Sequence, residues 1–70
     1  MTVIKVIELV GTSDRNWQEA VDNAVQRASK TIRNIQGVDV LGWTGKVEED
    51  KISEYRANVK ISFAVEKVAG

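Results

Sequence analysis

The sequence predicts an α+β domain with the element order β-α-β-β, in which a three-stranded antiparallel sheet wraps on one long helix. Two observations predict this fold. Residues 16–35 carry apolar side chains at helical spacing, and residues 52–65 alternate between apolar and polar side chains with the period of a strand. A right-handed crossover between the first two strands leaves space for the third strand between them, which gives the strand order 1-3-2.

The first strand is predicted over residues 2–10, which are rich in β-branched side chains and end at Gly11. Both of its faces are apolar, with Val3, Ile7 and Leu9 on one face and Ile4, Val6 and Val10 on the other. The helix can cover only one face, so we expect a second copy of the chain to cover the other. The alternative is a set of exposed valines, which are common on protein surfaces.

The helix is predicted over residues 16–35, after a turn over residues 11–15. Its apolar stripe consists of Trp17, Ala20, Val21, Ala24, Val25, Ala28, Ile32 and Ile35. Asn16 is a favourable N-cap and Glu19 follows at the spacing of a capping box, while Ser13 is the competing cap if the helix begins earlier. Gly37, just beyond the stripe, is a typical residue at a helix end.

The second strand is predicted over residues 38–47, where Gly42 and Gly45 indicate a bulge or a close backbone approach. Val38 and Val40 are expected to point to one face, and Leu41, Trp43 and Val47 to the other. Residues 48–50 form an acidic hairpin tip. Three acids in a row could hold a hard cation, but the pattern is more typical of a solvated turn.

The third strand is predicted over residues 52–65, in the middle of the sheet. One face of it is apolar and is expected to pack on the helix: Tyr55, Ala57, Val59, Ile61, Phe63 and Val65. The opposite sheet face is expected to combine Ile4, Val6 and Trp43 with the polar side chains of Arg56, Asn58 and Lys60. A half-apolar face without a cover is typical of an interaction surface.

The size and composition limit the function. The 70 residues form one domain, 1–70, with no Cys or His to supply a disulfide or a zinc site. Such a small chain is marginally stable alone, so we expect oligomerisation. Ten basic and ten acidic residues give a net charge of zero, which offers no attraction to nucleic acid or to an anionic membrane. We expect a soluble, cytoplasmic protein, because the first apolar segment is interrupted by Lys5 and Glu8.

The residue types also argue against catalysis. Without His, Ser13 has no base to activate it as a nucleophile, and the chain has no phosphate-binding Gly loop. We expect no enzyme and no metal centre. Two classes remain, a small-molecule-binding module built at subunit interfaces and a structural assembly without a ligand. Trp43 is consistent with a core residue, a subunit contact or a stacking surface for a planar ligand.

Several segments together resemble the dodecin family, over nearly the whole chain from about Val3 to Glu66. The resemblance is carried by Val6-Ile7-Glu8-Leu9-Val10-Gly11-Thr12-Ser13, by Trp17, Ala24, Arg27 and Ala28, and by Glu54-Tyr55 and Val59-Lys60-Ile61-Ser62-Phe63. It implies a small β-α-β-β protein that assembles as a hollow shell of twelve subunits. It also implies flavin storage, with FMN or riboflavin stacked in pairs between tryptophans at subunit contacts.

The chain departs from the dodecin pattern at three ligand positions. The flavin-stacking Trp of the family corresponds to Gly37, the Gln that hydrogen-bonds the flavin to Arg56, and an acidic position to Gly42. The chain therefore resembles the branch without the stacking Trp, some members of which are described as calcium-binding. The expected function is a non-enzymatic shell that stores a small ligand at its subunit interfaces. A calcium-binding, ion-binding or purely structural shell is the alternative.

Two residues are our own candidates for ligand contacts in this chain. Trp43 could stack on a planar ligand, and Arg56 could attract an anionic group such as a phosphate.

Overall fold

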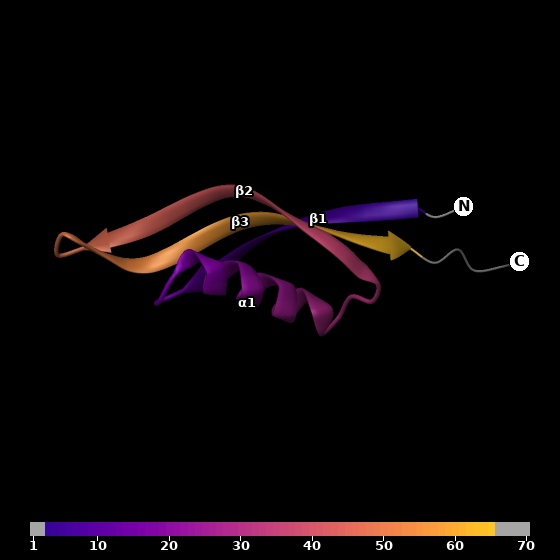
Figure 1. Cartoon of the computed structure of the whole chain (residues 1–70), viewed down its shortest axis with the longest axis horizontal. Helices are drawn as coiled ribbons and strands as arrows, with labels where there is room; N and C mark the ends of the chain where they lie inside the picture. The colour runs from indigo at the N-terminus through magenta and orange to yellow at the C-terminus, as the bar shows by residue number, and fades with distance from the viewer. Residues whose placement is uncertain (1–2, 66–70) are drawn as a thin grey trace, which may run out of the picture.

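The predicted β-α-β-β architecture and strand order are confirmed. The computed structural model describes residues 3–65, with strand β1 (Val3–Ser13), helix α1 (Trp17–Ser29), strand β2 (Ile35–Glu48) and strand β3 (Lys51–Val65) (Figure 1). The predicted first residue of β1, Thr2, lies outside the described residues. The sheet has the order β1-β3-β2, and both pairings are antiparallel. Helix α1 lies against one face of the sheet, called the helix face below, and the opposite face is called the open face.

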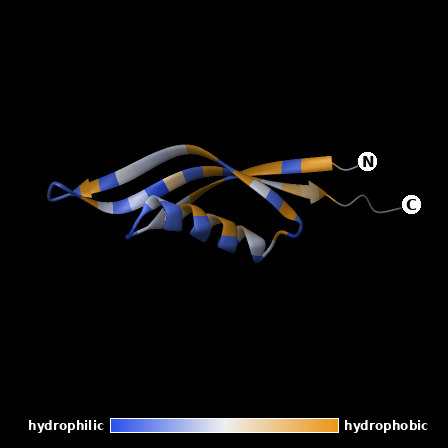
Figure 2. Ribbon diagram, in the orientation of Figure 1, coloured by the Kyte–Doolittle hydropathy of each residue, from blue (hydrophilic) through white to orange (hydrophobic). Residues whose placement is uncertain are grey.

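The core lies between α1 and the helix face, and it is small. Ala57, Val59 and Ile61 of β3 are fully buried, as the alternation of β3 predicts. They pack against the core residues of α1, namely Ala20, Val21, Ala24 and Ala28. Figure 2 shows hydrophobic and hydrophilic residues alternating along this helix, as in an amphipathic helix. Four of these seven core residues are alanines, so little apolar volume is removed from water. Most of the larger apolar side chains stay at least partly exposed.

Helix α1 approaches β1 closely at Gly11. A Cβ atom at this position would collide with the carbonyl oxygen of Ala20 and would lie 2.9 Å from the Cβ of Ala24. Gly11 pairs with Ala57 inside the sheet, because β1 continues to Ser13. The prediction that Gly11 begins the turn into the helix was therefore wrong. The missing side chain serves the helix–strand contact, where any Cβ atom would prevent the close approach.

The start of α1 agrees with the sequence. Asn16 is the N-cap, because its side-chain oxygen accepts a hydrogen bond of 2.7 Å from the Glu19 backbone N–H. The reciprocal bond of the predicted capping box, from the Asn16 backbone N–H to the Glu19 carboxylate, is replaced by bonds to Ser13. The Glu19 carboxylate accepts a hydrogen bond from the Ser13 hydroxyl, at 3.1 Å, and Ser13 Oγ accepts from the backbone N–H groups of Arg15 and Asn16. Ser13 therefore fixes the turn that precedes the N-cap.

The end of α1 differs from the prediction, because the helix stops at Ser29 and not at residue 35. The Ile32 N–H still bonds to the Ala28 carbonyl at 2.9 Å, but Asn34 adopts the left-handed conformation, with φ of 63°, and turns the chain into β2. Ile32, in the connection, and Ile35, in β2, both pack against the core. Both residues are thus partly buried, as the helical spacing of apolar residues predicts, although neither belongs to the helix.

A β-bulge in β2 changes the predicted orientation of its side chains. The register shifts between Val40, which faces Val59, and Gly42, which faces Asn58, so Leu41 is an extra residue. The predicted bulge at Gly42 is thus confirmed. Its consequence was missed: Val38, Val40 and Trp43 lie opposite Ile61, Val59 and Ala57, all on the helix face. The prediction that Trp43 points away from Val38 and Val40 was therefore wrong.

Candidate functional site

The open face of the sheet carries side chains in rows across the three strands. In order along β3, the rows are Val6-Ser62-Gly37, Glu8-Lys60-Asp39, Val10-Asn58-Gly42 and Thr12-Arg56-Thr44. Large apolar side chains are half-exposed on or beside this face: Ile4, Val6, Val10 and Leu41. Helix α1 covers only the helix face, so these groups have no cover within residues 3–65. The predicted half-apolar interaction face is thus present, although Trp43 is not part of it.

Two glycines of β2, Gly37 near its start and Gly42 in its middle, leave two positions of this face without a side chain. A Cβ atom on Gly37 would lie 3.2 Å from Ser62 Oγ, and one on Gly42 would lie 3.8 Å from Asn58 Nδ2. Val10, Leu41 and Asn58 border an open hollow of about 310 Å³ next to Gly42. The positions at which the family resemblance implies ligand contacts, residues 37, 42 and 56, therefore all belong to the open face.

Arg56 lies on the open face between Thr12 and Thr44. Its guanidinium donates two hydrogen bonds to one carboxylate oxygen of Glu54, from Nη2 at 2.9 Å and from Nε at 3.1 Å. This ion pair is partly exposed, so it contributes roughly 1 kcal/mol or less to stability. It also offsets the charge that was expected to attract an anionic ligand. The role of Arg56 in ligand binding stays a prediction.

Trp43 lies on the helix face, at the start of α1, because of the bulge at Leu41. The Trp17 ring stands edge-on to Trp43, with centroids 6.5 Å apart, and edge-on to Tyr55, at 4.7 Å. The Trp17 indole N–H donates a hydrogen bond of 2.9 Å to the Thr44 carbonyl. Trp43 remains 53% exposed. Trp43 and Arg56, our two candidate ligand residues, therefore lie on opposite faces, and one chain does not bring them together.

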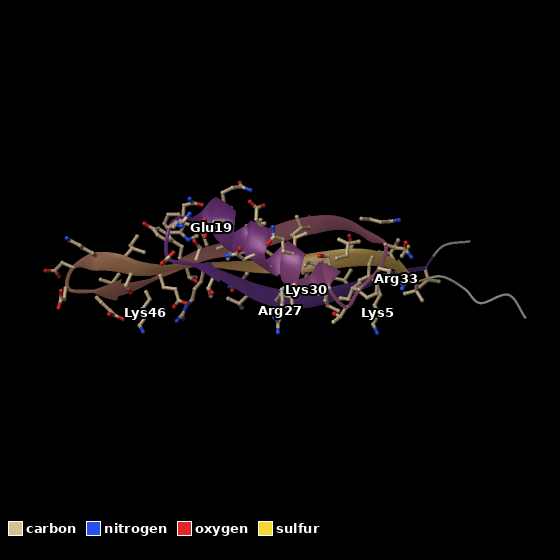
Figure 3. The ribbon with its side chains drawn as sticks, turned by 90° about the horizontal axis from the view of Figure 1, so that it is seen from below. Lys5, Glu19, Arg27, Lys30, Arg33 and Lys46 are labelled. Atoms are coloured by element: carbon tan, nitrogen blue, oxygen red, sulfur yellow. The ribbon has the colours of Figure 1, made fainter. Side chains whose placement is uncertain are left out.

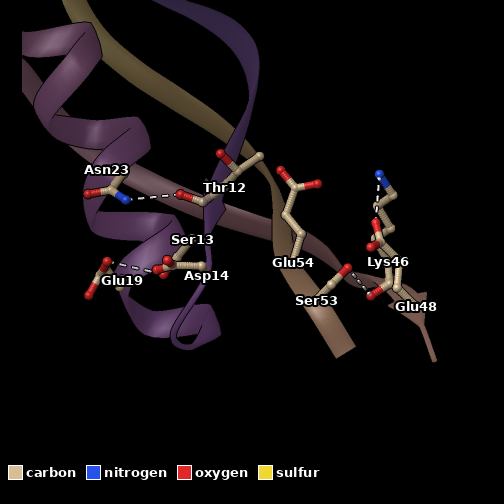
Figure 4. Close-up of a pocket in the computed structure, with 9 residues that line it drawn as sticks. All are labelled: Thr12, Ser13, Asp14, Glu19, Asn23, Lys46, Glu48, Ser53 and Glu54. Carbon is tan, nitrogen blue, oxygen red and sulfur yellow. Dashed lines mark hydrogen bonds and ion pairs between the residues drawn. The ribbon is translucent and has the colours of Figure 1, made fainter. Parts of the chain in front are cut away.

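Carboxylates gather around a second hollow, of about 490 Å³, between the start of α1 and the hairpin of β2 and β3 (Figure 4). Four acidic residues line it, Asp14, Glu19, Glu48 and Glu54. Three of them are within ion-pair distance of a basic side chain: Glu19 of Arg15, Glu48 of Lys46 and Glu54 of Arg56. Within residues 3–65, no three acidic side chains converge as metal ligands.

The geometry defines a class of small sheet-and-helix proteins with an uncovered, half-apolar sheet face. The dodecin family model matches residues 3–66, and the chain belongs to the dodecin family. The curated relatives include Dodecin of Thermus thermophilus, 34% identical over 65 residues that cover 93% of this chain and 94% of the relative. They also include Calcium dodecin of Mycobacterium tuberculosis, 35% identical over 63 residues that cover 90% of this chain and 89% of the relative.

Solved structures agree with this assignment. The dodecin of Streptomyces coelicolor superposes with a TM-score of 0.92 at 33% identity, over 94% of each chain. The calcium dodecin of Mycobacterium tuberculosis, described as having a novel calcium-binding site, superposes with a TM-score of 0.81 at 31% identity, over 97% of each chain. Within residues 3–65, no helix is both long enough and apolar enough to span a membrane.

Proposed function

We propose that this protein is a non-catalytic, dodecin-type shell of twelve copies, located in the cytoplasm, that stores a small ligand where open faces meet. The observation that carries this proposal is the open face itself. Ile4, Val6, Val10 and Leu41 are 47–59% exposed, whereas the core within residues 3–65 has only seven residues. A surface of this kind on a monomer would be unfavourable in water, whereas contact between copies would bury it.

The energies support assembly over a free chain. Covering the exposed half of one such side chain contributes roughly 1 kcal/mol, so the four together contribute about 4 kcal/mol per subunit. The stability of a chain of this size is itself only about 3–10 kcal/mol. Contact between open faces would therefore supply a large fraction of the total stability.

The test of assembly is the native mass. Twelve copies of the 7.8 kDa chain have a mass of about 94 kDa. We expect native mass spectrometry and light scattering to report this value at micromolar concentration. A folded species with the mass of one chain would contradict the proposal.

For the ligand, the open position at Gly37 suggests a direct experiment. The resemblance places the flavin-stacking ring of the family at this position, and Gly37 lies on the open face opposite Ser62. Replacing Gly37 with Trp is expected to raise the affinity for FMN or riboflavin by about tenfold to a hundredfold, because a stacked ring contributes roughly 1–3 kcal/mol. Flavin fluorescence quenching measures the change.

The matched control for this experiment is Gly37→Leu, which adds apolar volume without an aromatic ring. Both substitutions place a Cβ atom 3.2 Å from Ser62 Oγ, so they share any steric cost. Equal flavin affinities for the Trp and Leu variants would contradict stacking at this position. Strong quenching by the unmodified protein would show that flavin is held by residues other than a Trp at position 37.

Calcium is the alternative ligand, favoured by the 35% identity to Calcium dodecin. Against it, most carboxylates around the second hollow already lie near basic side chains, which would have to move before a cation could bind. Titration calorimetry with calcium, and with magnesium as the control, separates the two proposals. A heat of binding that is seen with calcium at micromolar concentration and not with magnesium would favour calcium, and not an organic molecule, as the stored ligand.

A further inference from the structure

The hairpin formed by residues 46–53, called the hairpin arm below, projects beyond the rest of the fold (Figure 1). The last pair of β1 with β3 is Ser13 with Tyr55, so the two strands of the arm pair only with each other. An isolated two-stranded hairpin is marginally stable in water. Val47 and Ile52 nevertheless expose 64% and 43% of their surface on this arm. The arm therefore carries apolar surface that the same chain does not cover.

The tip of the arm is acidic and conformationally unusual. Glu49 and Asp50 both have positive φ angles, of 51° and 63°, as in a two-residue type I′ turn. Asn-Gly is the favoured sequence for this turn, because those residues adopt the left-handed conformation more easily. Glu48 pairs with Lys46 at 3.2 Å, whereas within residues 3–65 no basic side chain lies within ion-pair distance of Glu49 or Asp50. Two carboxylates are thus held at a strained, projecting turn.

A groove that is apolar and positively charged, and so complements the apolar, acidic arm, lies between α1 and β1. Ile7, Leu9 and Ile32 supply apolar surface to this groove of about 390 Å³, and Arg27 and Lys30 supply positive charge. Figure 3 shows Arg27 and Lys30 on the β1 side of the helix. Among the described residues, neither side chain has an acidic partner within 4.0 Å. This surface is called the basic groove below.

We propose that the hairpin arm of one copy docks into the basic groove of the next copy. Val47 and Ile52 cover the apolar groove, while Glu49 and Asp50 pair with Arg27 and Lys30. The arm cannot reach the groove of its own chain, since the groove lies near the end of α1 and the arm extends from the opposite end of a molecule 58 Å long (Figure 1). The occupant is therefore a second copy.

This contact differs from the one between open faces. It joins two different surfaces, so it runs head to tail and closes into a ring when the rotation between copies permits. The inference rests on the proposed self-assembly but adds a second contact to it. The acidic tip and basic groove would also fix the relative orientation of the copies, because charge complementarity gives register more than affinity.

The test of this contact removes the charges at the tip of the arm while it keeps the turn folded. Replacing Glu49 with Asn and Asp50 with Gly installs the preferred turn and removes both carboxylates. We expect a folded chain whose assembly is weaker, with the concentration at half-dissociation raised by about twofold to thirtyfold for two lost ion pairs. Arg27→Glu with Lys30→Glu should weaken assembly at least as much. Asp22→Asn, at an exposed position on α1, is the control and should change nothing.

The charge exchange gives the decisive result. Glu49→Lys and Asp50→Lys, combined with Arg27→Glu and Lys30→Glu, are expected to restore the assembly that either pair alone weakens. Circular dichroism checks that each variant is folded. Unchanged half-dissociation in the tip and groove variants of an oligomeric protein would overturn this contact and leave the proposed shell intact. A monomeric unmodified protein would overturn the shell itself. Weakening by the groove variants alone, without rescue, would show that something other than the arm occupies the groove.

Discussion

Replacing Gly11 with alanine is expected to destabilise the protein by about 3 kcal/mol or more, a large part of its total stability. The new Cβ atom would collide with the Ala20 carbonyl oxygen and press on the Ala24 Cβ. Neither neighbour is the end of a flexible side chain, so helix and strand would have to separate. That separation would open the core between α1 and the helix face, where Ala57 and Val59 are fully buried.

The matched control is Gly42→Ala, since Gly42 also lies in a strand but its new Cβ would meet Asn58 Nδ2 at 3.8 Å, an ordinary contact. Both substitutions remove one glycine from the unfolded chain, so that entropic effect cancels in the comparison. Urea unfolding at one fixed protein concentration measures the difference, because assembly makes stability depend on concentration. Equal unfolding midpoints would mean that α1 can move away from β1 without loss.

The sequence predicted the fold where one physical effect dominates. The alternation of β3 identified the buried face correctly, because Ala57, Val59 and Ile61 lie in the middle of the sheet and under the helix. The apolar residues on both faces of β1 likewise predicted an uncovered face. In both cases the period of two decides which sheet face a side chain occupies.

The prediction from sequence failed where a helix end or a β-bulge interrupts the regular spacing of apolar side chains. Ile32 and Ile35 continue the helical spacing, yet they reach the core from a connection and from β2, so periodicity could not locate the end of α1. The bulge at Leu41 moved Trp43 to the helix face, which separated it from Arg56. Gly42 indicated a bulge, but only the register with β3 shows which residue is extra. A candidate site that depends on one strand face is sensitive to such a shift.

The largest effect on assembly is expected from Val6→Glu. Val6 is 50% exposed on the open face, opposite Ser62, where contact between copies would bury the new carboxylate. A buried charge without a partner costs about 3–5 kcal/mol, and in a symmetric shell every copy carries the same cost. We therefore expect the mass to fall from that of the shell to that of single chains. These chains should be largely unfolded, because the seven-residue core is then their main source of stability.

Val3→Glu is the control for this prediction, because Val3 is in the same strand and is 59% exposed, but its partner Val65 belongs to the helix-face side of β3. The two variants have the same composition and net charge, and the carboxylates lie on opposite sheet faces of the same strand, three residues apart. Native mass spectrometry and circular dichroism should report an assembled, folded Val3→Glu protein and a dissociated Val6→Glu protein. If both variants stay assembled, the open face does not hold the shell together, and the ligand would have to bind elsewhere. If both dissociate, the contact between copies extends around β1 to the helix face, and assembly would depend on the strand as a whole.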